Sequence, residues 1–417
     1  MNITYDDNII AFINKSNNMC ICIEIKYIYY VNQTNNNFTI YYFKKDKNNN
    51  ITKSEITIDD RYFDDDLIES RIIWSKKYKK IKELVNIQPK RYFFLINPKS
   101  GTEYGKSIFK NVISSTLDDT FHAYNDYYIC EDGTIEYIIT QYIEQIRSCD
   151  VFVVVGGDGT LNSTLQIYKK LNISTPLGII PTGTGNGLAK SISYTNKCNN
   201  PTIMDYLYYI MKGNTNLVNV NRCYVGDSMN MYYSLVGQSW GLPSSVDIRS
   251  EKFRWMGSFR FTLQTLIELA FMTKYEGTIR YLPYTEDNKK YMNCEEFNLT
   301  TTNVPAVETI QGGFTLVWVC QIPFMSTDMK VAPDGKLNDD KFYLVIIRDS
   351  ISRYELLKLF LSLQYGNHIM SSYVEIIPIL AYDLDILFDN NLITIDGEPF
   401  YDDQMSVRQD KPIKMVF

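Results

Sequence analysis

The chain has 417 residues, of which 45% are hydrophobic and 22% are charged. This length and composition are typical of a globular protein with two domains, or with two domains and a smaller extension. Acidic residues (48) outnumber lysines and arginines (42), and the net charge of -6 argues against a nucleic-acid-binding protein that relies on a basic surface. Only two histidines, His122 and His368, are present, which argues against a multi-histidine metal site and a serine–histidine–aspartate hydrolase.

Targeting signals are not evident in the sequence. The first residues, MNITYDDNII, lack a basic stretch followed by an apolar run, so we expect no signal peptide. No apolar run approaches the ~20 residues that a transmembrane helix needs. We therefore expect a cytoplasmic protein that associates with membranes only peripherally.

Residues 1–90 are predicted to form a β-rich N-terminal extension. The segments CICIEIKYIYYV and NFTIYYFKK have the composition of strands and are separated by a polar loop. A basic helix is expected to follow, over residues 65–85. This combination resembles a reduced pleckstrin-homology-like module, and the alternative is a set of strands packed against the body of the protein.

Residues 91–213 are predicted to form a doubly wound α/β domain. The runs RYFFLI, VFVVVG and PLGIIP are continuously apolar, as expected of parallel strands that are buried on both faces. Each run ends in a turn, and helical patterns such as LNSTLQIYKKL lie between the runs. Strand, turn and helix in alternation indicate this fold class.

Residues 214–417 are predicted to form a mostly antiparallel β-sandwich. Strand patterns occur at short spacing in VNVNRCYVG, MYYSLVG, TIRYLPY, FTLVWVCQI, FYLVIIRD and ILFDNNLITIDGEP. One strong helical pattern, SFRFTLQTLIELAFM, interrupts them.

The three apolar runs of the α/β domain end in turns rich in glycine and small polar residues, namely INPKSG, GGDGT and PTGTGNG. Such turns lie at the carboxyl ends of the strands, where α/β sheets bind ligands, and their amides can bind anionic oxygens. They match neither a Walker P-loop nor a Rossmann fingerprint. The candidate nucleotide-binding residues are Asn97, Lys99, Gly101, Gly156, Gly157, Gly159, Thr160, Gly183, Thr184, Gly185 and Asn186.

The ordered set NPKSG, GGDGT and PTGTGNGLA resembles the diacylglycerol kinase catalytic superfamily, which includes sphingosine, ceramide and bacterial diacylglycerol kinases and is distantly related to the NAD kinases. The resemblance begins near Arg91 and continues almost to the C-terminus. It implies an ATP-dependent lipid kinase in which Mg2+ bridges the phosphates of ATP and the β-sandwich binds the lipid. It also implies that Asp158 is the catalytic base, and it assigns no metal ligand from the protein.

The segment SWGLPSSVDIRSEKFRWMGSFRFTLQTL is similar to a pattern of the sphingosine kinases. The resemblance implies that Asp247 binds the ammonium group of a sphingoid base, and that Arg254 and Arg260 contact the ATP phosphates. A carboxylate is the natural partner of a cationic amine, and arginines suit a phosphoryl group. By the same resemblance, Leu242, Val246 and Phe261 line the lipid pocket.

A late motif, TIDGEP, resembles the segment of this superfamily that returns to the nucleotide site. The resemblance makes Asp396, Gly397 and Glu398 candidates for contact with the nucleotide, and a simple hairpin turn is the alternative. The apolar segment from Leu356 to Met370 is either a contact surface for a peripheral membrane or a buried helix. A homodimer also stays open.

The sequence departs from the superfamily pattern at some positions. Ser163 replaces an acidic residue shortly after GGDGT, Cys130 stands where a threonine is usual, and Ser245 replaces an aspartate near Asp247. These departures leave a catalytically inactive lipid-binding or nucleotide-binding homologue open. A ceramide or diacylglycerol kinase is the second alternative, and Asp247 favours the sphingoid base because ceramide carries no charged amine.

Overall fold

The structure is a computed structural model of the chain. It describes residues 2–5, 9–14, 19–24, 28–33, 37–45, 51–59, 90–101, 105–118, 123–129, 134–198, 200–226, 230–256, 259–293, 306–387 and 391–417. The helix expected over residues 65–85 lies outside these ranges.

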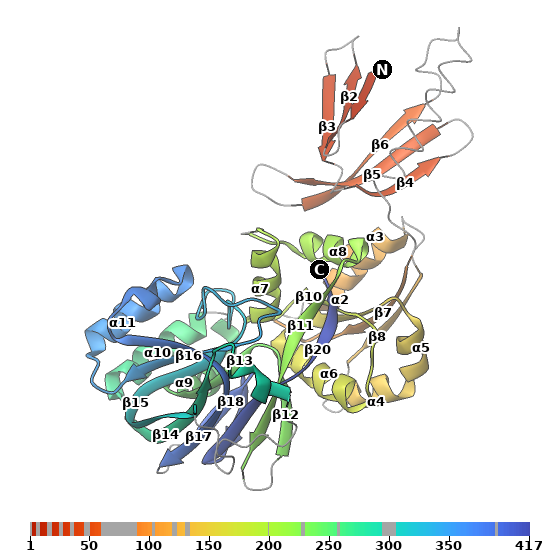
Figure 1. Ribbon diagram of the computed structural model, residues 1–417. Helices are drawn as coiled ribbons and strands as arrows, with labels where there is room; N and C mark the ends of the chain where they lie inside the picture. Colours follow the sequence, from red (N-terminus) through yellow and green to blue (C-terminus); the bar gives the residue numbers. More distant parts are fainter. Residues whose placement is uncertain are drawn as a thin grey trace.

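The N-terminal segment forms two three-stranded antiparallel sheets, with strand orders β1-β2-β3 and β4-β5-β6. The strands are β1 (Asn2–Tyr5), β2 (Ile9–Asn14), β3 (Met19–Glu24), β4 (Ile28–Gln33), β5 (Asn37–Lys45) and β6 (Ile51–Asp59). Strands β4 and β6 contact helix α8 of the following unit, and Lys53 Nζ donates a hydrogen bond of 3.0 Å to the Ser115 carbonyl. The β-rich extension therefore packs against the body of the protein through its second sheet (Figure 1).

Four parallel strands form the centre of the next part of the chain, which we call the α/β unit. They are β7 (Arg91–Ile96), β8 (Ala123–Tyr128), β9 (Val151–Gly156) and β10 (Leu177–Pro181), and their order is β8-β7-β9-β10. Every residue of β9 is buried, as its continuously apolar sequence predicts.

Helices cover both faces of these strands, and Figure 1 shows α3 and α8 on one side and α4 and α6 on the other. The helices are α2 (Gly105–Ile108), the π-helix η3 (Phe109–Ser114), α3 (Ser115–Asp118), α4 (Thr134–Gln141), α5 (Ile143–Ser148), α6 (Asp158–Lys170), α7 (Gly187–Thr195) and α8 (Ile203–Lys212). The amphipathic helix α8 begins with a capping box between Thr202 and Asp205 and ends at Gly213, whose φ of 71° is left-handed. This layout confirms the predicted α/β class.

The remaining strands pair almost entirely antiparallel, and we call this part the antiparallel unit. They are β11 (Thr215–Val225), β12 (Asn230–Ser234), β13 (Gly237–Gly241), β14 (Tyr275–Pro283), β15 (Glu308–Cys320), β16 (Phe342–Arg348), β17 (Val374–Leu387), β18 (Leu392–Ile395), β19 (Glu398–Tyr401) and β20 (Gln404–Val416). The antiparallel strands expected after residue 214 are thereby confirmed.

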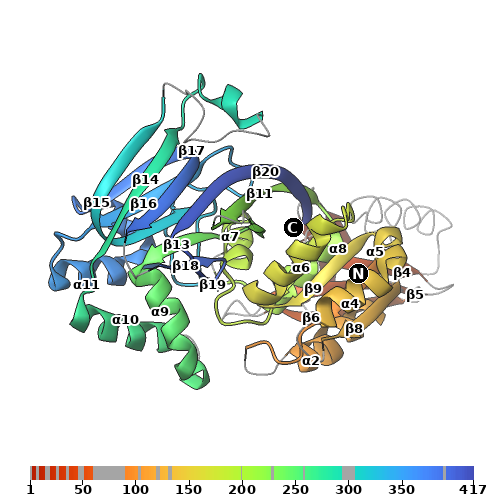
Figure 2. The same ribbon diagram turned by 90° about the horizontal axis from the view of Figure 1, so that it is seen from below.

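The helices of the antiparallel unit are α9 (Leu242–Ser250), η4 (Glu251–Met256), α10 (Phe259–Phe271), η5 (Lys289–Asn293), α11 (Arg353–Ser362), η6 (Leu363–Tyr365) and η7 (Asn367–Met370). Figure 2 shows α9, α10 and α11 together on one side of the sheet. No helix in the described part of the chain is both long and apolar enough to cross a membrane.

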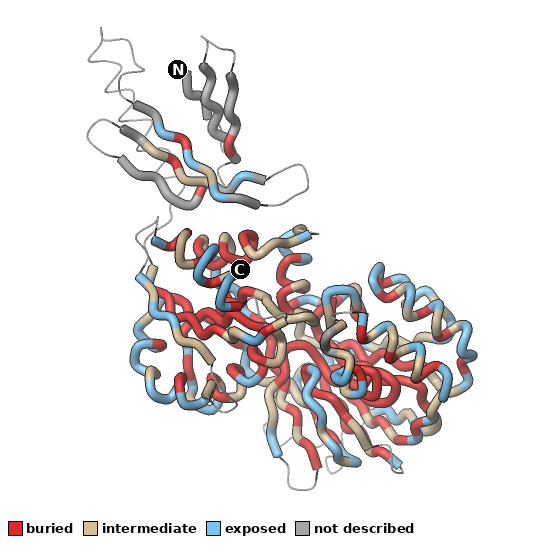
Figure 3. The backbone as a smooth tube through the Cα atoms, turned by 180° about the vertical axis from the view of Figure 1, so that it is seen from behind, coloured by how far each residue is buried: buried red, intermediate tan, exposed pale blue. Residues whose placement is uncertain are grey.

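Strand β20 joins the two units into one sheet. It pairs antiparallel with β11 and β17 and parallel with β10, where Met415 lies opposite Leu177. Figure 2 shows β20 as a long curved strand that crosses from one unit to the other. The two largest clusters of buried apolar side chains centre on the α/β unit and on the antiparallel unit. Figure 3 shows buried residues along the strands of both units. A domain boundary was expected between residues 213 and 214, and it stays a prediction. The pairing of β10 with β20 connects the parts of the chain on either side of it.

Candidate active site

The three glycine-rich turns meet at the carboxyl ends of β7, β9 and β10. The backbone amide of Asn97 donates to the Val155 carbonyl at 2.9 Å, and the amide of Thr182 donates to the Gly156 carbonyl at 2.9 Å. The Asn97 side chain donates to Thr160 Oγ1 at 2.8 Å. Because the strand order reverses between β7 and β9, these turns lie at the switch point where doubly wound folds bind ligands.

Glycines allow the first, second and third turns to touch. A methyl group on Gly183 would lie 2.6 Å from the Gly157 Cα atom, closer than a side chain can approach. Gly101 has a φ of 62° and lies against the Thr182 carbonyl. The predicted cradle of backbone groups is therefore assembled, and glycine is required because main chains approach each other there.

Asp158 is the first residue of α6 and faces the third turn. Its Oδ2 atom accepts a hydrogen bond of 2.9 Å from the Gly187 amide, whereas Oδ1 is buried and has no hydrogen-bond partner among the described residues. Burial raises the pKa of Asp158 to about 6, the amide of Gly187 opposes this rise, and the nearby charge of Asp396 adds to it. Asp158 therefore holds an unpaired oxygen of raised basicity.

Two further carboxylates lie beside these turns. A methyl group on Gly397 would be 3.5 Å from Asp247 Oδ2, and one on Gly159 would be 3.3 Å from Glu398 Oε1. Burial raises the pKa of Asp247 to about 7, and the positive charge of Arg260 opposes this rise. The structure thus brings the predicted residues Asp158, Asp247 and Glu398 to one place.

Of the two arginines predicted to bind phosphate, the structure describes the side chain of Arg260. Arg260 is buried, forms an ion pair with Glu251 and stacks its guanidinium 4.4 Å above the Phe261 ring. A phosphate contact by Arg260 stays a prediction. The side chain of Arg254 and residue Cys130 lie outside the described parts of the chain.

Asn162 is a residue of this region that the sequence analysis missed. It lies one turn after Asp158 on α6, and its side-chain amide donates to Asp396 Oδ2 at 3.0 Å. Ser163, which replaces the expected acidic residue, is exposed instead. The signal that could have revealed Asn162 is its helical spacing from Asp158, which places both side chains on one face.

Three predicted lipid-binding residues lie in the antiparallel unit, on α9 and α10, which contact each other. Leu242 and Val246 are buried on α9, and Phe261 packs against the same apolar cluster from α10. A small apolar cavity lies nearby under α11, and its walls are Leu316, Trp318, Ile347, Leu356, Leu359, Phe360, Leu363 and His368. The segment from Leu356 to Met370 therefore contributes a buried face, which the sequence analysis had left as one of two alternatives.

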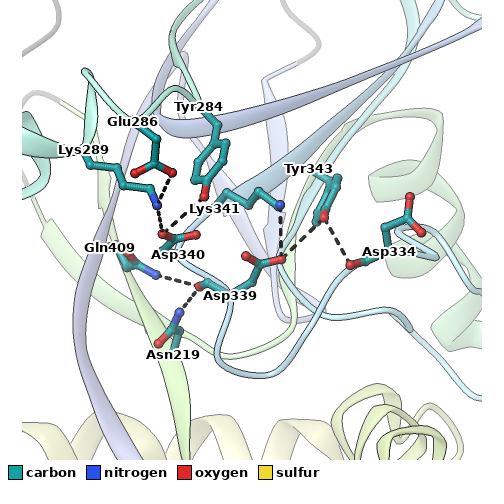
Figure 4. Close-up of polar contacts among 10 residues, drawn as sticks. All are labelled: Asn219, Tyr284, Glu286, Lys289, Asp334, Asp339, Asp340, Lys341, Tyr343 and Gln409. Atoms are coloured by element: carbon teal, nitrogen blue, oxygen red, sulfur yellow. Dashed lines mark hydrogen bonds and ion pairs between the residues drawn. The ribbon is translucent and has the colours of Figure 1, made fainter.

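Acidic residues before β16 form a separate polar cluster, drawn in Figure 4. The Asp340 carboxylate forms an ion pair with Lys289 Nζ at 2.7 Å, and the Asp339 carboxylate forms one with Lys341 Nζ at 3.8 Å. The backbone carbonyl of Asp339 accepts hydrogen bonds from Asn219 on β11 and Gln409 on β20. These hydrogen bonds hold the loop before β16 against strands β11 and β20. Among the described residues, no group of three His, Cys, Asp or Glu could hold a metal ion.

Comparison with known proteins agrees with this geometry. Residues 91–223 match the family model of the diacylglycerol kinase catalytic domain. The chain is 28% identical over 352 residues to sphingosine kinase 1 of Arabidopsis thaliana. That alignment covers 76% of this chain and 68% of the relative. It is 25% identical over 342 residues to mouse sphingosine kinase 1, with 75% and 86% covered. The crystal structure of a diacylglycerol kinase from Bacillus anthracis superposes with a TM-score of 0.53 at 12% identity, covering 78% of this chain and 96% of that one.

Residues 91–223 are thus similar to a diacylglycerol kinase catalytic domain, and the fold of the chain is similar to that of a bacterial diacylglycerol kinase. The curated relatives that it resembles along three quarters of its length include sphingosine kinases. The resemblance expected from the three turns and the SEKFRWMGSFRF segment is confirmed.

Proposed function

We propose that this protein transfers the γ-phosphoryl group of ATP to the primary hydroxyl group of a sphingoid base. The observation that carries the proposal is the convergence of Asp158, Asp247 and Glu398 around the glycine-rich turns. Its sphingosine kinase relatives support the same class of substrate.

Asp158 is the proposed general base. In this proposal its Oδ1 atom, which has no hydrogen-bond partner among the described residues, accepts the proton of the lipid hydroxyl as the oxygen attacks the γ-phosphorus, and the bond from that phosphorus to the oxygen that bridges the β- and γ-phosphates breaks, releasing ADP. A base is most effective when its pKa lies near the working pH, and burial moves the pKa of Asp158 to about 6. The Gly187 amide keeps the carboxylate oriented through Oδ2.

Asp247 is the proposed partner of the lipid ammonium group. A buried carboxylate whose pKa is raised to about 7 gains most from a cation that restores its charged form. Ceramide and diacylglycerol carry no such cation, so they would leave Asp247 unsatisfied. The apolar residues of α9, α10 and the cavity under α11 are the proposed surroundings of the alkyl chain.

Lys99 and the backbone amides of the three turns are proposed to hold the triphosphate. Lys99 is an exposed residue of the first turn. Mg2+ in such sites is usually held by phosphates and by one or two carboxylates, and Glu398 is the candidate from this chain. When bound, the ion would neutralise charge on the β- and γ-phosphates.

The test is phosphate transfer from γ-labelled ATP with Mg2+, with sphingosine, ceramide and diacylglycerol presented in parallel. We expect label on sphingosine and a loss of about 10²–10⁴-fold in kcat for Asp158→Asn. Asp247→Asn should raise KM for sphingosine while KM for ATP changes little. Label on ceramide or diacylglycerol instead would contradict the role of Asp247. No label on any lipid, with ATP still bound, would favour the inactive homologue.

We also propose that α10, α11 and η7 rest on a membrane surface. Helix α11 contacts both α10 and η7, and the exposed apolar side chains include Phe271 of α10 (74% exposed) and Met370 of η7 (85% exposed). Replacing both by serine should weaken co-sedimentation with vesicles of phosphatidylcholine and phosphatidylserine. Tyr137→Ser on α4, which is 65% exposed, is the control. Equal binding by both variants would contradict this surface.

A further inference from the structure

The carboxylate of Asp396, near the site, accepts hydrogen bonds from five donors. Its Oδ1 atom accepts hydrogen bonds from Ser234 Oγ at 2.6 Å and from the amides of Val236 and Gly237 at 3.0 and 2.9 Å. Its Oδ2 atom accepts hydrogen bonds from the Leu235 amide at 2.8 Å and from Asn162 Nδ2 at 3.0 Å. A carboxylate offers about four lone-pair sites, so these five donors leave it no capacity for a ligand.

The donors come from elements that carry the acidic side chains of the site. Asn162 lies on α6, which begins at Asp158. Residues 234–237 span the end of β12, its connection to β13 and the start of β13, and β13 runs directly into α9, which carries Asp247. Asp396 itself lies in the two-residue turn between β18 and β19, directly before Gly397 and Glu398.

The backbone of Asp396 contributes to the same set of contacts. Its φ of 50° is left-handed, and Gly397 follows with a φ of 86°, which is the pattern of a type I′ hairpin turn. The Asp396 amide donates to the Gly237 carbonyl at 2.9 Å, so main chain and side chain both bind the connection between β12 and β13.

A second contact strengthens the link between α6 and β12. The Gln166 side chain, one turn beyond Asn162, accepts a hydrogen bond of 2.9 Å from the Tyr233 amide and donates one of 2.8 Å to the Tyr233 carbonyl. Gln166 also donates to Asn162 Oδ1 at 3.1 Å, which orients the Asn162 amide toward Asp396.

We infer that Asp396 is a positioning residue that fixes Asp158, Asp247 and Glu398 relative to one another across the two units. In this arrangement Asp396 touches neither the nucleotide nor Mg2+, and it acts through α6, the β12–β13 connection and the β18–β19 turn. The catalytic part of the inference rests on the proposed kinase function.

The experiment compares Asp396→Asn, Asn162→Ala and the double variant in the full chain, with labelled ATP and sphingosine. Asparagine tolerates the left-handed backbone but replaces one acceptor oxygen with a donor that faces other donors. We expect Asp396→Asn to lower kcat about tenfold or more while KM for ATP and the Mg2+ requirement stay within about threefold. Asn162→Ala should lower kcat less, and the double variant should be no worse than Asp396→Asn alone.

Asp403→Asn is the matched control, because it makes the same chemical change at an exposed residue between β19 and β20. A large rise in KM for ATP or in the Mg2+ requirement of Asp396→Asn, with kcat unchanged, would show direct contact and overturn the inference. A kcat equal to that of Asp403→Asn would also overturn it. If Asp396→Asn fails to fold, Asn162→Ala alone must still lower kcat with an unchanged KM for ATP.

The same variants separate failure of this inference from failure of the proposed function. If the natural sequence labels none of the lipids, the kinase proposal fails, and urea denaturation of the four proteins in the cycle still tests the contact. Non-additive shifts of the unfolding midpoint would support coupling between α6 and the β18–β19 turn. Additive shifts would overturn it.

Discussion

At the residue scale, the site holds two carboxylates, Asp158 and Asp247, in surroundings that disfavour their charged forms. Burial is the largest cause of the raised pKa in both. Such groups lower the stability of the fold near neutral pH, and they are retained where a base or an ion-pairing partner is needed. Stability and activity should therefore respond in opposite directions when these residues are neutralised.

The first prediction is that Asp158→Asn stabilises the fold near neutral pH. The folded-state pKa of about 6 exceeds the ordinary value of 3.8, so the protonated form contributes stability that is complete below about pH 4 and is lost as the pH rises through 6. Asparagine does not titrate, so the variant keeps its stability over this range. The difference in unfolding free energy between the variant and the unsubstituted protein should therefore shift by on the order of 2 kcal/mol in favour of the variant from pH 4 to pH 8. Urea denaturation at both values measures the difference. A variant that is less stable at pH 8 would mean that the bond from Gly187 outweighs the cost of burial.

The second prediction concerns the pH dependence of lipid binding. Because burial raises the pKa of Asp247 to about 7, this carboxyl group of the free protein gains a proton as the pH falls below that value. KM for sphingosine should then rise about tenfold per pH unit on the acid side, since only the carboxylate pairs with an ammonium group. KM for ATP, measured in the same series, is the control. A KM for sphingosine that is constant from pH 5.5 to 8 would contradict the ammonium contact.

At the element scale, the glycine-rich turns were predictable from sequence because apolar runs and turn residues are local signals. The meeting of GGDGT with TGTGNG follows from the parallel order of β9 and β10. The role of Asn162 was not predictable from composition, because its partner Asp396 lies 234 residues away. Helix α9 was also missed, since its segment LPSSVDIRS has no amphipathic pattern and is held by contacts with β13 and β15.

The third prediction follows from the contact between two of these turns. In Gly183→Ala the new methyl group would lie 2.6 Å from Gly157 Cα and 3.0 Å from Asn186 Oδ1, so the turns must separate. Amides that bind phosphate would move with them, and ATP affinity measured by calorimetry should fall about tenfold or more. Ser163→Ala, at an exposed position of α6, is the control. Unchanged affinity in Gly183→Ala would show that the third turn does not bind the triphosphate.

At the scale of the whole molecule, the strand that joins the two units was the main omission from the sequence analysis. Strand β20 has the sequence QMSVRQDKPIKMV, in which charged residues and Pro412 obscure the alternation of Met405, Val407, Ile413 and Met415. Proline lacks the amide that a strand ladder needs, and the pairing of β20 with β11 shifts register between Asp410 and Ile413, where Pro412 lies. A strand with an internal irregularity is weakly marked in sequence, although it links both units.

The interface beside β20 also carries buried charge. The Asp410 carboxylate binds Lys169 of α6 at 2.6 Å and Arg222 of β11 at 3.3 Å, and Lys169 and Asp410 are mostly buried. Removing one partner of such a group leaves a poorly solvated charge, so this network opposes separation of the units. Together with the pairing of β20, it suggests that the two units unfold as one.

The fourth prediction tests this cooperativity with two methionines on β20. Met415 belongs to the apolar cluster of the α/β unit and Met405 to that of the antiparallel unit, and both are buried. Each change to alanine should cost about 2–5 kcal/mol of unfolding free energy. Because one sheet spans both units, either substitution should speed hydrogen exchange in β9 and β15 alike, at urea concentrations just below the transition. If Met415→Ala affects only β9 and Met405→Ala only β15, the units unfold separately and β20 does not couple them.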